Sequence, residues 1–578
     1  MGTNATLEMN SQAFRLPGEL QSAVRTALQE CKNQNVVSRV WGKDATLWTG
    51  KDEGKWLGWL DVVRQSREGI PQLEAIAADI KSAGMSQVLL LGMGGSSLCP
   101  EVVAKTFGQA AGYPRLLVLD STDPAQIASF DRSVNPSKTA YIVSSKSGST
   151  LEPNILQRYF FDRARSVLGA EDAAKRFIAI TDPGSQLEQL ARREGFRHIL
   201  AGVPSIGGRF SALSNFGVAP AAIAGIDLRS FLGRTEEMVL ACRNPSVEEN
   251  PGLMLGVVLG TLGSKGHDKI TMISSPGVSD LGAWLEQLIA ESTGKLGKGL
   301  VPVDGEHCGP PDVYGRDRLF VYLRLESDAS AEQDRALQAL ERAGHPVVTI
   351  SIADRYNLGQ EFFRWEFATA IAGSLMGINP FDQPDVEAAK VEARKLTSEY
   401  ERTGSLAAER PMAQERGIQL FTDDANVAQL KKGDSSVRAM IKAHLDRIQP
   451  GDYFALLAYV EMNERHVEAL QTIRHAVRDR RRVATCLGFG PRFLHSTGQL
   501  YKGGPNTGVF LQITCADATD LPVPDQKYTF SVVKAAQARG DFQVLLDRRR
   551  RAVRVHLTAG LDQGLAFLRE LVEAGLTR

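Results

Sequence analysis

The sequence predicts an α/β fold of doubly wound, mostly parallel sheets. From residue 88 onward, short apolar runs alternate with longer stretches of helical periodicity, which is the pattern of parallel strands joined by helices. The runs are apolar throughout, as strands buried on both faces are. Two of them end in clusters of glycine and hydroxyl residues, and the carboxyl edge of such a sheet is where ligands bind.

The elements follow in order along the chain. The first 80 residues are expected to be helical and to contribute packing aromatics. The expected strands are 88–92, 115–120, 140–144 and 176–181, then a run from 268, 318–326 and 346–352, then 452–461, 481–490, 508–517, 541–548 and 551–559. Helices are expected over 360–376 and from Pro384 to Arg402. The basic run Arg548–Arg551 is expected to be a solvated turn between two strands. These elements predict four parts: a helical region 1–80, α/β domains 81–235 and 236–402, and a C-terminal α/β domain 403–578.

The bulk composition narrows the function. The 578 residues carry a formal net charge of zero, which argues against a general nucleic-acid or anionic membrane surface. The six cysteines show neither metal-ligand spacing nor a disulfide framework. No apolar leader and no run of membrane-spanning length is visible, so we expect a cytoplasmic protein. The absence of Cys and His ligand clusters agrees with the expectation that the protein uses no metal and no cofactor.

Two clusters at strand ends are candidate phosphate loops. One is Gly92-Met93-Gly94-Gly95-Ser96-Ser97, and the other is Ser144-Ser145-Lys146-Ser147-Gly148-Ser149-Thr150. Glycine lets the backbone approach an anion, while hydroxyls and helix N-terminal N–H groups donate hydrogen bonds to it. The second cluster is equally typical of an ordinary helix N-cap. The dinucleotide fingerprint and the Walker lysine are both missing, which argues against those ligands.

Three further motifs carry candidate chemistry. Gly207-Gly208-Arg209-Phe210-Ser211 offers an arginine whose planar fork suits a phosphate or an enediolate, although alone it is more typical of a surface turn. Gln287 and Glu291 are four residues apart and share one face of a predicted helix, where Glu291 is either a general base or an exposed carboxylate. The third motif runs from Asn379 to Lys390 and would otherwise be a capped surface helix.

Taken together and in this order, the motifs resemble the phosphoglucose isomerase family. The resemblance covers about residues 80–400, and it implies sugar-isomerase (SIS) domains with doubly wound sheets. The whole chain looks closest to the isomerase half of bacterial transaldolase–phosphoglucose isomerase fusions. The chain has no room for the transaldolase barrel, so no transaldolase activity is expected.

The resemblance implies a role for each motif residue. Glu291 would be the base that moves a proton between C2 and C1, Arg209 would stabilise the cis-enediolate, and Lys390 would assist ring opening. The substrate would be held by Gly95, Ser96, Ser145, Lys146, Ser147, Thr150, Gln287 and Gln383. The expected partner is a small hexose phosphate, and family members are often homodimers.

One departure from the family concerns its histidine. The motif close to Gly-Gln-His-Ala-Phe-Tyr-Gln-Leu is missing between the Glu291 and Lys390 motifs. A later stretch, Phe493-Leu494-His495-Ser496-Thr497-Gly498-Gln499-Leu500, has the same His-x-x-x-Gln-Leu spacing. We therefore predict that His495 opens the sugar ring, because histidine exchanges protons near neutral pH. Otherwise His495 would be a loop histidine bonded to the backbone.

These residues predict reversible isomerisation of glucose 6-phosphate and fructose 6-phosphate. Two alternatives stay open. One is an isomerase of another hexose phosphate, such as mannose 6-phosphate or an aminosugar phosphate. The other is a non-catalytic phosphosugar-binding module, which would leave the motifs around Glu291, Lys390 and His495 without a purpose.

Overall fold

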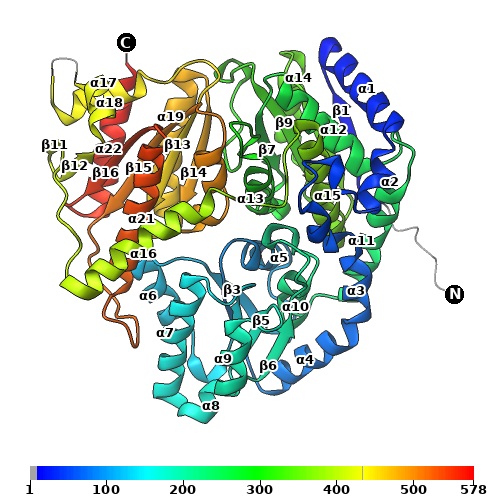
Figure 1. Cartoon of the computed structure of the whole chain (residues 1–578), viewed down its shortest axis with the longest axis horizontal. Coiled ribbons are helices and arrows are strands. Elements are labelled where there is room, and N and C mark those ends of the chain that lie inside the picture. The colour runs from blue at the N-terminus through cyan, green and yellow to red at the C-terminus, as the bar shows by residue number, and fades with distance from the viewer. Residues whose placement is uncertain (1–8, 432–433, 578) are drawn as a thin grey trace. The chain divides into compact units, whose positions relative to one another are not determined.

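A computed structural model describes residues 9–431 and 434–577 (Figure 1). The chain forms two compact units. The first runs to Asp120 and continues over Val134–Thr293 and Leu319–Asp382. The second comprises Ser121–Ser133, Gly294–Arg318 and the chain from Gln383 onward. The α/β class with mostly parallel sheets is confirmed, whereas the division into four domains stays a prediction. Among the described helices, none combines the length and apolar character needed to cross a membrane.

The first sheet of the first unit is parallel throughout. Its strands are β2 (Gln87–Leu91), β3 (Arg115–Leu119), β4 (Thr139–Ser144), β5 (Phe177–Thr181) and β6 (His198–Ala201), in the order β3-β2-β4-β5-β6. The four expected strands are confirmed, and β6 is an addition that the sequence pattern missed. The chain leaves β2 toward β3 and then crosses back to β4, so the order reverses between β2 and β4. Such a switch point opens a crevice at the carboxyl ends of the two strands.

The second sheet of this unit contains one strand in the region expected to be helical. Strand β1 (Ser11–Arg15) pairs antiparallel with β10 (Val347–Ile352), which runs parallel to β9 (Arg318–Leu325), and β7 (Lys269–Ser274) follows β9. The expectation of helix over all of residues 1–80 was therefore wrong for β1. The strand is a short edge strand without a single fully buried side chain, so its sequence carries no apolar alternation.

Helices complete the first unit. They are α1 (Gly18–Asn33), α2 (Val36–Trp41), α3 (Val62–Glu68), α4 (Ile70–Ser82), α5 (Leu98–Phe107), α7 (Leu151–Leu168), α8 (Ala170–Ala174), α9 (Gln186–Glu194), α10 (Asn215–Ile223), α11 (Leu228–Arg243), α12 (Pro251–Ser264), α13 (Leu281–Thr293), α14 (Ala331–Arg342) and α15 (Leu358–Met376). Helices α12 and α15 approach very closely, since a Cβ atom on Gly256 would lie 2.5 Å from the carbonyl oxygen of Ala368. Glycine at this position therefore sets the helix spacing.

The second unit is a three-layer α/β structure. Its sheet has the order β11-β12-β16-β15-β13-β14, in which β14, β13, β15 and β16 are parallel. The strands are β11 (Ala413–Glu415), β12 (Ile418–Phe421), β13 (Tyr453–Tyr459), β14 (Ala484–Phe489), β15 (Gly508–Cys515) and β16 (Arg551–Leu557), and a short strand β8 (Val301–Val303) also lies in this unit. The parallel strands repeat the strand order of the first sheet, because β13 takes the place of β2 and β14 that of β3.

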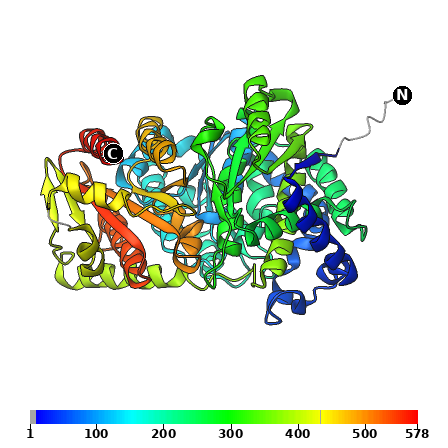
Figure 2. The ribbon, with the colours of Figure 1, turned by 90° about the horizontal axis from the view of Figure 1, so that it is seen from above.

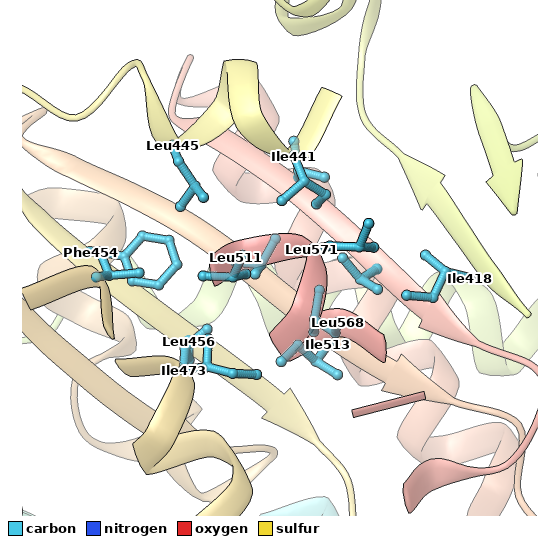
Figure 3. Packing of buried hydrophobic residues seen from close by; sticks show 14 of the residues in the cluster. Ile418, Ile441, Leu445, Phe454, Leu456, Ile473, Leu511, Ile513, Leu568 and Leu571 are labelled. Carbon is cyan, nitrogen blue, oxygen red and sulfur yellow. The ribbon is translucent and has the colours of Figure 1, made fainter. Parts of the chain in front are cut away.

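Helices cover both faces of this sheet. Helices α18 (Val437–Leu445), α19 (Glu464–Arg481) and α22 (Leu561–Leu576) bury the apolar cluster that Figure 3 shows from close by. Helix α21 (Phe530–Asp547) packs against β15 and β16, and α16 (Val386–Thr403) lies along α21 in Figures 1 and 2. The remaining helices are α6 (Pro124–Ser133), α17 (Asp424–Leu430) and α20 (Gly498–Gly503).

One expected strand is part of a helix. Residues 541–548 belong almost wholly to α21, so the strand expectation there was wrong. The local run Val544-Leu545-Leu546 looks strand-like, but it continues a helix whose first turn is capped by Thr529. The run Arg548–Arg551 consequently lies between a helix and a strand. It is also not simply solvated, because Arg550 is buried and donates to the carbonyl oxygens of Lys502 and Gly504.

Candidate active site

The two candidate phosphate loops lie at the switch point of the first sheet. Leu91 and Val143 are register partners at the ends of β2 and β4, so both loops leave the same edge. The loops approach closely, since a Cβ atom on Gly92 would lie 3.3 Å from the carbonyl oxygen of Ser144. The second loop leads directly into the N-terminus of α7, which has no side-chain cap. The first N–H groups of a helix have no partner within the helix and suit an anion.

The side chains of the second loop differ in their surroundings. Ser145 is buried, and its hydroxyl has no hydrogen-bond partner among the described residues. The Lys146 ammonium contacts the Asp182 carboxylate and donates to the carbonyl oxygen of Val203 at 3.2 Å. Ser147 is exposed, and Thr150 precedes α7 without a side-chain capping bond. The loop therefore holds one unpaired buried hydroxyl and one lysine already neutralised by a carboxylate.

The first loop touches the turn that carries Arg209. A Cβ atom on Gly95 would lie 2.0 Å from the carbonyl oxygen of Gly208 and 2.9 Å from the backbone nitrogen of Arg209. Glycine at 95 is therefore required for the contact, and the buried Ser96 follows in the same turn. The contact joins the phosphate-loop candidate to the arginine motif.

Arg209 is fixed from four directions. Its Nε donates to the Ser292 hydroxyl at 2.7 Å, and its Nη2 donates to the carbonyl oxygens of Pro380 and Asp382 at 2.7 and 2.9 Å. Its Nη1 lies 3.2 Å from Oε1 of Glu291. Burial lowers the pKa of Arg209, while the charges of Glu291 and Asp382 raise it. The guanidinium is thus held rigidly, with a carboxylate on one edge.

Glu291 and Gln287 lie on one face of α13, as their spacing predicts. Gln287 Nε2 donates to Oε2 of Glu291 at 3.0 Å. The two oxygens of Glu291 therefore receive one amide and one guanidinium, and the side chain keeps 12% of its surface exposed. A carboxylate that is oriented yet still reachable has the features of a general base.

His495 and Lys390 belong to the second unit. His495 ends a short 3₁₀ turn, Arg492–His495, that follows the carboxyl end of β14, and it is half-buried. The motif thus lies at the carboxyl edge of its sheet, where ligands bind in such folds. Lys390 is exposed on α16, with Nζ 3.8 Å from Oε2 of Glu387, and Gln383 precedes the helix in an exposed position. The grouping of these residues with Glu291 stays a prediction.

Several residues of the site were missed by the sequence analysis. Ser292 and the carbonyl oxygens of Pro380 and Asp382 hold Arg209, and Asp182 holds Lys146. Asp182 could have been found, because it directly follows β5 at the carboxyl edge of the sheet. Backbone carbonyls leave no signal in a sequence. Within the described part of the chain, no three His, Cys, Asp or Glu side chains are grouped so as to hold a metal ion.

A doubly wound sheet with glycine- and hydroxyl-rich loops at its switch point is typical of α/β proteins that bind a small phosphorylated molecule. The comparisons refine this class. A family model described as phosphoglucose isomerase matches residues 67–305. A glucose-6-phosphate isomerase of Rubrobacter xylanophilus is 30% identical over 375 residues, which cover 56% of this chain and 86% of that protein. A glucose-6-phosphate isomerase of Clostridioides difficile is 30% identical over 397 residues, covering 58% and 85%.

Solved structures of similar fold include members of the same class. A hypothetical protein from Thermus thermophilus has a TM-score of 0.57 at 26% identity, over 66% of this chain and 99% of that one. A glucose-6-phosphate isomerase from Chlamydia trachomatis has a TM-score of 0.54 at 20% identity, over 67% and 88%, and supports the fold alone. The chain belongs to the phosphoglucose isomerase family.

Proposed function

We propose that this protein interconverts glucose 6-phosphate and fructose 6-phosphate by proton transfer through a cis-enediolate. The observation that carries the proposal is the pair formed by Glu291 on α13 and the buried Arg209, 3.2 Å apart. The turn that carries Arg209 also touches the Gly95 loop. Family membership supports the same reaction, since the relatives with 30% identity are named glucose-6-phosphate isomerase.

Binding begins at the switch-point loops. Ser145, Ser147, Thr150 and the backbone around Ser96 would donate to the substrate phosphate, and the N-terminus of α7 would add its favourable dipole. The Lys146 ammonium would contribute positive charge by donating to the phosphate as well as to Asp182. Fixing the phosphate lets the remote binding energy orient the reacting carbons.

Ring opening and isomerisation follow. His495 and Lys390 would exchange protons at O5 and O1 of the sugar ring, with Gln383 lining the pocket. Glu291 would then remove the proton from C2 and return it at C1, while the O2 hydroxyl proton passes to O1. Gln287 would orient the Glu291 carboxylate. Arg209 would stabilise the enediolate charge. Every step moves protons only, so the chemistry requires neither a redox cofactor nor a metal.

The test is turnover of fructose 6-phosphate in metal-free buffer, followed with an NADP-dependent glucose-6-phosphate dehydrogenase. We expect turnover that falls at least about a thousandfold in Glu291→Gln, which keeps the shape but cannot take a proton. Near-normal turnover in Glu291→Gln would remove Glu291 as the base. Turnover of mannose 6-phosphate instead, or binding without turnover, would contradict the proposed reaction.

His495 is tested separately. We expect His495→Ala to lower turnover about a hundredfold or more, the usual scale of a lost general acid. A variant that isomerises at the wild-type rate would show that His495 is a loop histidine.

Sedimentation of the wild-type protein would show whether it forms the homodimer that is common in the family.

A further inference from the structure

A buried glutamine lies at the centre of a hydrogen-bond network in the second unit. Gln499 is the fourth residue after His495, lies on α20 and is fully buried. Its side-chain oxygen accepts from the backbone nitrogen of Asp385 at 2.9 Å. Its side-chain nitrogen donates to the Asp385 carboxylate at 2.8 Å and to the carbonyl oxygen of Gly294 at 2.9 Å. The amide thus uses its oxygen and both N–H groups, which fixes its orientation.

The partners of Gln499 lie next to other functional segments. Asp385 immediately precedes α16, the helix that carries Lys390. Gly294 directly follows α13, the helix that carries Glu291, in the chain. The contacts join residues 114 and 205 positions apart in the sequence. Within the second unit, Gln499 therefore links the His495 segment to Gly294 and to the residue that precedes the Lys390 helix.

Asp385 is also held from its other side. Arg548 Nη2 lies 2.6 Å from Oδ1 of Asp385, whereas Gln499 takes Oδ2. Each carboxylate oxygen therefore has its own donor. Arg548 belongs to the basic run 548–551, whose buried member Arg550 binds the carbonyl oxygens of Lys502 and Gly504 at the end of α20. Two arginines of the basic run thus stabilise the network: Arg548 holds Asp385, and Arg550 holds the end of α20.

Packing around the network leaves no spare room. A Cβ atom on Gly503 would lie 2.3 Å from Oδ2 of Asp385, 2.7 Å from Nε2 of Gln499 and 2.8 Å from the carbonyl oxygen of Gly294. Any side chain at this position would displace the polar atoms of the network. Gly503 therefore offers a second, independent way to disturb it.

We propose that Gln499 is a positioning residue for sugar-ring opening. It holds the His495 segment against the first turn of the Lys390 helix, so that acid and base keep one spacing. The inference rests on the proposed function, since it concerns how His495 and Lys390 act. Such positioning matters because a displacement of about 1 Å can slow a reaction about a hundredfold.

The experiment separates ring opening from isomerisation. In a Glu291→Gln background, the carbon-bound proton does not move, but the α and β forms of glucose 6-phosphate can still interconvert through the open chain. NMR exchange spectroscopy measures that interconversion directly. Adding Gln499→Ala should slow it about 10- to 100-fold. In the otherwise wild-type chain, Gln499→Ala should lower kcat by the same factor, with KM changed less than about threefold.

Gln512 provides the matched control. It is the same residue type, is equally buried in the second unit, and donates to the carbonyl oxygen of Ala538 at 3.0 Å. Gln512→Ala should lower the melting temperature similarly and leave ring opening unchanged. Equal ring-opening rates in Gln499→Ala and Gln512→Ala would overturn the inference.

Two further variants keep the test decisive if Gln499→Ala does not fold. Gln499→Glu preserves the shape and the acceptor for Asp385 but, when ionised, loses both donors, and Gly503→Ala leaves Gln499 intact while crowding it. Both should slow ring opening selectively, and normal rates in either folded variant would overturn the inference. A wild-type chain that neither isomerises nor interconverts the anomers would instead disprove the proposed function. An active wild type with unimpaired variants would disprove the inference alone.

Discussion

Replacing Arg209 by lysine separates its structural role from its chemical role. The guanidinium serves four acceptors: the Ser292 hydroxyl, the carbonyl oxygens of Pro380 and Asp382, and Glu291. A lysine ammonium has only three N–H donors and no planar fork, so at least one buried acceptor loses its donor. An unsatisfied buried group costs about 1–3 kcal/mol, which sets the expected loss of stability.

The expected effect of Arg209→Lys on kcat is larger than its effect on stability. In the proposed reaction Arg209 stabilises developing negative charge, and removal of such a donor typically costs about 100- to 1000-fold in kcat. We therefore expect Arg209→Lys to lose at least about a hundredfold in kcat with fructose 6-phosphate, measured with the coupled dehydrogenase. Calorimetry on the same samples gives the change in melting temperature.

Arg364 is the control for this substitution. It is equally buried in the first unit, its Nη2 lies 3.2 Å from Glu361, and it donates to the carbonyl oxygen of Asn10 at 2.7 Å. Arg364→Lys should destabilise the protein similarly but leave kcat within about threefold of wild type. If Arg209→Lys keeps as much activity as Arg364→Lys, Arg209 serves structure only and the reasoning fails.

Ser145→Ala removes a buried unpaired hydroxyl, so the melting temperature should stay unchanged while KM rises about tenfold. The control Ser144→Ala should change neither quantity. An unchanged KM in Ser145→Ala would exclude Ser145 from the phosphate site. Burial lowers the pKa of His444 to about 3, so the unfolded chain takes up a proton below about pH 6.5 and the folded chain does not. As the pH is lowered from neutral to 4.5, stability should therefore fall by about 3 kcal/mol, and urea unfolding of His444→Gln should lack this loss; an identical pH slope would contradict the assignment. Gly95→Ala would place a Cβ atom 2.0 Å from the carbonyl oxygen of Gly208, so kcat should fall more than about tenfold and wild-type kinetics would disprove the need for this contact.

The parts of the fold that could be predicted depend on local sequence. Strand β2 is apolar at every buried position, and β4 holds the buried apolar run Ala140–Val143, so their pattern alone is decisive. Gln287 and Glu291 meet because residues four apart on a helix share a face. The prediction for the residues of β1 was wrong because an edge strand needs only backbone pairing, here with residues more than 300 positions away.

Long-range contacts explain the remaining gaps. The acceptors that orient Arg209 include a carbonyl group 171 residues away, and backbone carbonyls are the same in every residue type. The helical state of residues 541–548 also depends on context, because a short apolar run is compatible with a buried strand or a buried helix. Motifs could therefore identify Arg209 and Glu291, but only the structure shows what holds them.

The pairing of Arg209 with Glu291 gives the proposed reaction a simple charge logic. Before proton transfer, the carboxylate and the guanidinium, 3.2 Å apart, balance each other beside a neutral substrate carbon. When Glu291 accepts the proton from C2, it becomes neutral at the moment when the enediolate becomes negative. The positive charge of Arg209 then stabilises the enediolate without moving, because Ser292 and two carbonyl groups already fix the guanidinium. Such preorganised charge needs no rearrangement during the reaction, which is the main source of electrostatic catalysis. Glu291→Gln should therefore remove the base and also the loss of negative charge at residue 291 that compensates the charge of the enediolate.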